Sequence, residues 1–148
     1  MEYLLNVTRQ TRENFIKLIE SSTVEELNEI PQGFNNNIIW NFAHIVASQQ
    51  GLCYLLANAE PVIESQYIAP FRKGTKPEKF VEAEEINTIK ELMRSTIDQL
   101  EQGLKRGKFI NFTPFKTHYG VEIKNADEAA QFFVVHDALH YGIASAIK

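Results

Sequence analysis

The chain has one cysteine, no excess of charge of one sign and no long hydrophobic run, and each absence excludes a class of protein. A single thiol, Cys53, cannot form an internal disulfide, which fits a reducing compartment. No apolar stretch approaches the ~20 residues of a membrane-spanning helix, so we expect no membrane insertion. The net charge of −4 comes from acidic and basic residues mixed along the chain, so the basic surface of a nucleic-acid binder is not expected.

The start of the chain also lacks the basic, apolar and cleavage regions of a secretory signal, which predicts a cytoplasmic protein. What is present is an ordinary globular composition, 44% hydrophobic and 23% charged. In a chain of this size one core buries roughly 70% of the unfolded surface, so residues 1–148 are predicted to form a single domain. Cys53 lies in an apolar stretch, where a small buried side chain is expected rather than a nucleophile or ligand.

Hydrophobic residues recur at helical spacing in four long stretches of the chain. The predicted helices cover residues 2–19, 36–58, 83–105 and a last stretch that begins at a cap formed by Asn125 or Asp127 and extends to Ile147. A capping box at Ser22 or Thr23 predicts a further short helix that ends before Pro31. The second long stretch is apolar nearly all round, which predicts burial on several sides.

Four long helices without a regular sheet predict an all-α fold, a four-helix bundle. The connection over residues 59–80 carries three prolines and is long enough to cross the length of the bundle. Such a crossover between the second and third helices gives an up-down-down-up order, in which the second and fourth helices run antiparallel. Residues 107–124, with β-branched and aromatic side chains around Pro114 and Gly120, predict an irregular segment or a short hairpin.

Two histidines of the last helix, His136 and His140, are four residues apart, so both project from one face about 6 Å apart along the axis and can reach one metal ion. They lie on the predicted apolar stripe of that helix, with Ala129, Phe132, Phe133, Leu139, Ile143 and Ile147. On a core-facing stripe the ring nitrogens of an imidazole lack water as a hydrogen-bond partner. A metal ion would satisfy one nitrogen of each ring, and a carboxylate, hydroxyl or carbonyl would satisfy the other. Packed or surface histidines are the alternative interpretation.

His44, on the second long helix, is the third candidate ligand. It lies about 12 Å from the start of its helix, and His140 and His136 lie about 10 and 17 Å from the end of theirs. Antiparallel packing therefore brings all three to one level. The sequence predicts a three-histidine metal site with an open coordination position, as in catalytic rather than structural zinc sites.

Two known patterns resemble the segment from His136 to His140 but fit it poorly. A zincin protease has glutamate in place of Asp137 and usually a further downstream ligand. The HD phosphohydrolases have a longer helical core with a further downstream aspartate. Because Asp137 lies about 100° around the helix from His136, a solvated charge or helix contact is expected, with support of a metal ligand as the alternative.

Several other side chains are expected to have ordinary structural roles. His118, close to Gly120, is expected on a surface loop, and Trp40 in the core. Four basic residues of the long connection are expected either on a solvated face or at a pocket mouth, where they would attract an anionic cofactor: Arg72, Lys73, Lys76 and Lys79.

The segments NIIWNFAHI, residues 37–45, and HDALH, residues 136–140, resemble the DinB superfamily of helical-bundle proteins, which includes the YfiT-like proteins. The shared pattern is a tryptophan four residues before a histidine, then a histidine pair spaced by four. The resemblance covers essentially the whole chain. It implies an up-down-down-up bundle and a metal triad of His44, His136 and His140.

The resemblance also implies nickel or zinc as the metal and a homodimer. Several members of the superfamily activate the thiol of a small cofactor such as bacillithiol, mycothiol or glutathione. The implied function is thus a metal-dependent thiol transferase, or a hydrolase, acting on a small electrophilic substrate. A metal-binding or structural bundle without catalysis, such as a stress-associated dimer, is the alternative.

Overall fold

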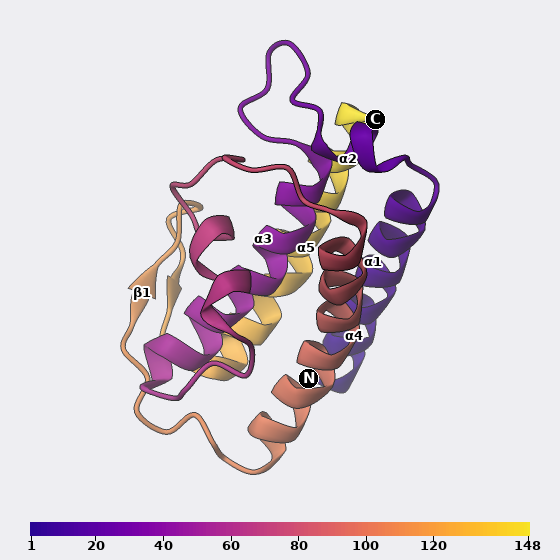
Figure 1. Ribbon diagram of the computed structural model, residues 1–148. Coiled ribbons are helices and arrows are strands. Elements are labelled where there is room, and N and C mark those ends of the chain that lie inside the picture. The colour runs from indigo at the N-terminus through magenta and orange to yellow at the C-terminus, as the bar shows by residue number, and fades with distance from the viewer.

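The computed structural model describes residues 1–148 and is built from four long helices. They are α1 (Glu2–Glu20), α3 (Ile38–Gln49), α4 (Ala83–Lys105) and α5 (Ala126–Ile147). Figure 1 shows α3 beside α5 and α1 beside α4, with the long connection passing over α3. The prediction of an all-α four-helix bundle is confirmed.

The contacts between helices give their directions. Lys148, at the end of α5, donates a hydrogen bond to the carbonyl of Ser21 just beyond α1, so these two helices run the same way. Arg9, early in α1, pairs with Asp98, late in α4, so α1 and α4 are antiparallel. Asn41, in the first turn of α3, contacts His140, late in α5, whereas Tyr54, beyond the end of α3, packs in one core cluster with Ala129, early in α5. These two helices are therefore antiparallel, and the up-down-down-up order is confirmed.

Side-chain caps fix where three helices begin. Thr23 accepts a hydrogen bond from the backbone N–H of Glu26, whose carboxylate accepts from the Thr23 N–H, and this capping box starts α2 (Val24–Asn28). Asn37 caps α3 and Asn125 caps α5 through their side-chain oxygens. A cap satisfies backbone donors that a helix leaves free, so the sequence positions of these residues determine the helix starts.

The second long helix is shorter than predicted. Regular α-helix ends at Gln49 and is followed by a π-helical turn, η1 (Gln50–Tyr54), and a 3-10 turn, η2 (Leu55–Ala57). In this conformation both Gln49 and Gln50 are buried; the Gln49 amide donates to the carbonyl of Thr96, and the Gln50 amide oxygen accepts from the N–H of Val62. These partners lie elsewhere in the chain, which is why helical spacing alone did not predict the break.

The two predicted irregular segments also take shape. The connection over residues 59–80 contains two short 3-10 turns, η3 (Ser65–Tyr67) and η4 (Ala69–Phe71), which contact α3. Between α4 and α5 the chain forms an antiparallel hairpin of β1 (Phe115–Lys116) and β2 (Glu122–Ile123). No helix combines the length and the apolar character that crossing a membrane requires.

Candidate metal centre

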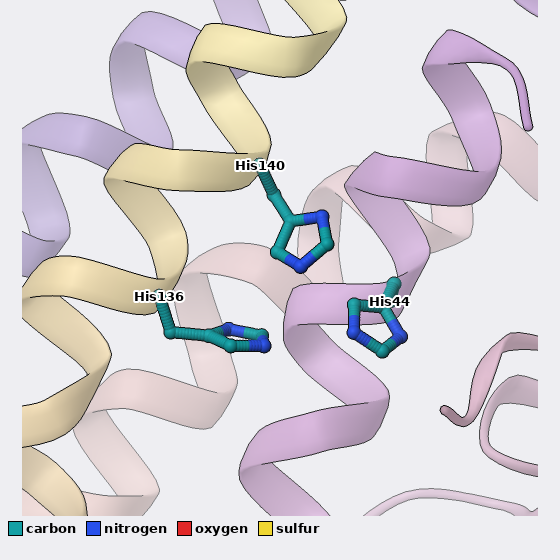
Figure 2. Close-up of side chains that lie close together, drawn as sticks. All are labelled: His44, His136 and His140. Carbon is teal, nitrogen blue, oxygen red and sulfur yellow. The ribbon is translucent and has the colours of Figure 1, made fainter. Parts of the chain in front are cut away.

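The three predicted histidines meet between α3 and α5. Figure 2 shows the ring of His44 on α3 facing those of His136 and His140 on α5. The ring centroid of His44 lies 5.3 Å from that of His136 and 4.5 Å from that of His140, and the latter two centroids are 4.6 Å apart. One ligand nitrogen from each ring can be chosen so that all three lie within 4.8 Å of one another. Antiparallel packing thus places the histidines at one level.

His44 is held by the long connection. Its Nδ1 lies 2.6 Å from the carbonyl oxygen of Phe71, and because a carbonyl only accepts, Nδ1 carries the proton. Nε2 then carries the lone pair, 3.2 Å from the hydroxyl of Ser48. Trp40 stacks on the ring at a centroid distance of 4.6 Å and an interplanar angle of 11°, and it is buried as predicted. These contacts orient His44 with Nε2 free to ligate.

His140 is held in the same way by Asn41. The two amide hydrogens of Asn41 go to the side-chain oxygen of Asn36 and the carbonyl of Asn37, so its Oδ1 remains as an acceptor. His140 Nδ1 lies 2.8 Å from that Oδ1 and donates to it, which leaves Nε2 for a ligand. Sequence reasoning did not identify Asn41 as a partner; the available signal was a polar residue inside an otherwise apolar helix.

Asp137, next to His136, makes a helix contact, one of its two expected roles, and it is not a solvated charge. Its side chain is 0% exposed, and its Oδ2 accepts a hydrogen bond from Arg12 Nε on α1 at 2.8 Å. The other carboxylate oxygen, Oδ1, lies 3.6 Å from His136 Nδ1. The Asp137 side chain, about 100° around the helix from that of His136, points at α1 rather than at solvent, and there it meets the buried Arg12. Arginine is seldom fully buried, so Arg12 was not predicted.

Burial keeps His44 and His140 uncharged. It lowers the pKa of His44 to about 4 and that of His140 to about 3, and in His140 the neighbouring histidines lower it further. Burial alone would raise the pKa of Asp137, but the charge of Arg12 and the contacts with His136 and Arg12 together outweigh it, and the carboxyl pKa lies below its ordinary value. At neutral pH His44 and His140 therefore present lone pairs that require no deprotonation before they ligate.

This donor set fits a divalent cation of the zinc or nickel kind. Such ions take imidazole nitrogens, and ligating histidines direct their second nitrogen at a carbonyl, amide or carboxylate, as His44 and His140 do here. The nitrogens of a tetrahedral zinc site lie about 3.3 Å apart. From separations of up to 4.8 Å, side-chain rotations that shorten the nitrogen–nitrogen distances by about 1.5 Å suffice.

A pocket of about 1020 Å³ opens directly onto the histidines. Its wall is mainly apolar and its mouth is polar: it is lined by Trp40, Ala47, Ser48, Gly51, Leu52, Leu55, Glu60, Pro61, Ile63, Ser65, Ile68, Ala69, Arg72, Lys73, Gly74, Phe115, Thr117, His118, Tyr119, Phe132 and Leu139 besides the three histidines. His118 is exposed, as predicted, and lies outside the histidine cluster. Arg72 and Lys73 are exposed at this pocket, whereas Lys76 and Lys79 line a separate one.

The pocket also explains a difference on α5. The predicted apolar stripe coincides only in part with the buried face of the helix, because Leu139 is 44% exposed and His136 and His140 are half-buried. The fully buried positions are Ala126, Ala129, Ala130, Phe133, Asp137 and Ala144. The stripe lies along the edge of the packed core: Ala129 and Phe133 are in the core, whereas Phe132 and Leu139 line the pocket.

The lowered histidine pKa values predict acid sensitivity of the metal-free protein. The unfolded chain takes up protons near pH 6.5, whereas folded His44 and His140 take them up only near pH 4 and 3, so stability is full above pH 6.5 and falls as the pH drops. One to two protons give a slope of about 1.4 to 2.7 kcal/mol per pH unit between roughly pH 6 and 4.5. Urea unfolding with a chelator present measures this slope, and a flat profile would contradict it.

The protein is thus a four-helix bundle that holds three imidazoles beside an open pocket. The family model described as the DinB superfamily matches residues 8–144, and the chain belongs to that superfamily. The identification from the tryptophan and histidine pattern is thereby confirmed. No curated protein shows significant sequence similarity to the chain.

Proposed function

We propose that the protein holds a divalent cation, nickel or zinc, at the Nε2 atoms of His44, His136 and His140, and that it catalyses attack of a small thiol, or of water, on a small electrophilic substrate. The observation that carries the proposal is the large pocket opening onto three imidazoles, two of which are kept neutral by burial and direct Nδ1 at an acceptor. A structural zinc site is usually closed by four protein ligands. The access to this cluster therefore favours catalysis over the alternative of a non-catalytic metal-binding bundle.

Charge supports this chemistry. A bound divalent cation with three neutral ligands keeps its full charge, which lowers the pKa of a thiol or water that reaches its free position. The chain itself contributes no thiol to the pocket, since Cys53 is fully buried and burial raises the pKa of its thiol. The nucleophile must then enter from solution.

The pocket wall suits a small organic substrate. Its volume of about 1020 Å³ is at the upper end of the range of about 300–1,000 Å³ typical of small-molecule sites, which leaves room for a thiol and an electrophile together. Leu52, Ile68 and Phe132 provide apolar contact, and the exposed cations Arg72 and Lys73 attract an anionic cofactor at the mouth. These residues bind and orient the reactants near the histidines.

The rate at which a thiol displaces halide from an aryl halide tests the proposal. Glutathione and a neutral thiol, 2-mercaptoethanol, are each mixed with a chromogenic aryl halide at pH 7; the thiol proton passes to the buffer, a carbon–sulfur bond forms and the halide leaves. We expect zinc- or nickel-loaded protein to accelerate the reaction relative to metal-stripped protein. The acceleration should persist at pH 6. Without the metal, a thiol reacts about tenfold more slowly at pH 6 than at pH 7, because about a tenth as much thiolate is present.

His44→Ala should lose the acceleration, and His118→Ala, which removes a histidine from the same pocket but not from the cluster, should keep it. Faster reaction of glutathione than of 2-mercaptoethanol, with the difference reduced in Arg72→Ala, would support the role of the cationic mouth. Equal rates with loaded and stripped protein, for both thiols and for hydrolysis of the halide, would contradict catalysis and favour the non-catalytic bundle.

A further inference from the structure

A buried ion pair lies directly behind His136. The side chains of Arg12 and Asp137 are 1% and 0% exposed, and their Nε and Oδ2 atoms are 2.8 Å apart. Arg12 Nη1 also donates to the carbonyl of Met93 and the hydroxyl of Thr96, both on α4. One guanidinium thus joins α1, α4 and α5 at the level of the histidines.

Three buried atoms in and beside the pair have no hydrogen-bond partner: Arg12 Nη2, Asp137 Oδ1 and His136 Nδ1. Asp137 Oδ1 and His136 Nδ1 are both buried, neither has a hydrogen bond, and they lie 3.6 Å apart. An unsatisfied buried polar atom costs about 1–3 kcal/mol, so the two have a strong reason to meet. In the other two histidines Nδ1 already donates, at 2.6 Å in His44 and 2.8 Å in His140. In His136 the potential acceptor, Asp137 Oδ1, is 3.6 Å from Nδ1 and makes no hydrogen bond with it.

We infer that Arg12 and Asp137 are positioning residues of the metal centre: Arg12 holds the Asp137 carboxylate in place, and Oδ1 accepts the proton of His136 Nδ1 so that Nε2 is left for the cation. This inference rests on the proposed function. A small rotation of the His136 ring closes the 3.6 Å gap to Asp137. The buried pair therefore sets which nitrogen of His136 ligates.

The arginine fixes the orientation of the carboxylate. Arg12 Nε binds Oδ2, and Arg12 Nη1 is anchored to Met93 and Thr96, so Oδ1 is left 3.6 Å from His136 Nδ1. A carboxylate oxygen that accepts the Nδ1 proton leaves the lone pair on Nε2, where it is required. Because the charges of Arg12 and Asp137 cancel, the pair orients the ligand without neutralising the cation.

The tautomer of His136 in the metal-free protein is a direct test. Long-range nitrogen–proton NMR spectra of protein with 15N-labelled histidine, recorded at pH 8, show which ring nitrogen carries the proton. We expect Nδ1–H for His136 in the wild type and transfer of the proton largely to Nε2 in Arg12→Met/Asp137→Leu, an apolar replacement of similar volume. Arg12→Lys, which keeps the charge, should retain Nδ1–H.

The signals of His44 and His140 serve as internal controls, since neither contacts the ion pair, and their unchanged tautomers would show that the variant is folded. Arg9→Met removes an exposed pair between α1 and α4 and should leave all three rings as in the wild type. A proton on Nε2 of His136 in the wild type overturns the inference, whichever variants fold. So does a folded double variant with the wild-type tautomer.

Zinc affinity gives an independent measure. Competition with a chelating dye should show binding weakened 10- to 100-fold in Arg12→Met/Asp137→Leu, the usual effect of losing a residue that supports a ligand, and unchanged in Arg9→Met. An unchanged affinity in the double variant would contradict the inference. If the wild type binds no zinc or nickel, the proposed function fails, while the NMR result still decides what orients His136.

Discussion

We expect the wild-type protein to carry a divalent metal and the His140→Ala variant to lose it. Removal of His140 leaves two imidazoles as ligands, because the cluster of potential ligand atoms contains only the three histidines and the nearby Asp137 carboxylate is bound to Arg12. The affinity should therefore fall by more than the 10- to 100-fold that loss of a supporting residue costs. Elemental analysis of protein purified without a histidine tag measures this directly, with about one nickel or zinc per chain expected in the wild type.

His118→Ala is the matched control, because it removes an imidazole from the wall of the same pocket without touching the cluster. Its metal content should equal that of the wild type. Metal retained at full stoichiometry by His140→Ala would show that the ion sits elsewhere. Absence of metal from the wild type, even after incubation with zinc or nickel and removal of the excess, would refute the metal centre.

The largest effect on stability is expected for Arg12→Met. The substitution leaves the fully buried Asp137 carboxylate without its counter-charge, and it also removes the hydrogen bonds that Arg12 donates to Met93 and Thr96. Breaking a buried ion pair from one side typically costs about 3–5 kcal/mol. Urea unfolding of the metal-free protein at pH 7 measures the change in the free energy of unfolding.

The double variant Arg12→Met/Asp137→Leu should recover most of that loss, because apolar replacement of both partners leaves no unpaired buried charge. Arg9→Met, which removes the partly exposed contacts of Arg9 with Asp98 and Glu101, should cost only about 0–1 kcal/mol. If Arg12→Met proved as mild as Arg9→Met, the carboxylate would have to be solvated or protonated in the folded protein, contrary to its observed burial.

Local sequence was sufficient to predict the four long helices, apart from the end of α3, and the three histidines that meet between α3 and α5. Apolar spacing and the caps at Thr23, Asn37 and Asn125 depend on neighbours within a few residues, so they can be identified along the chain. The depth of His44 in its helix follows from a constant rise per residue. Given antiparallel packing, this arithmetic was enough to predict that His44 meets the pair on the last helix.

The contacts that orient the histidines depend on the tertiary structure. Asn41 is 99 residues from His140, the carbonyl of Phe71 is 27 residues from His44, and Arg12 is 125 residues from Asp137. An arginine on an amphipathic helix is ordinarily solvated, and an aspartate beside a histidine has no preferred partner in the sequence. Their burial depends on which side of α5 contacts α1, and that is fixed by the packing of all four helices together.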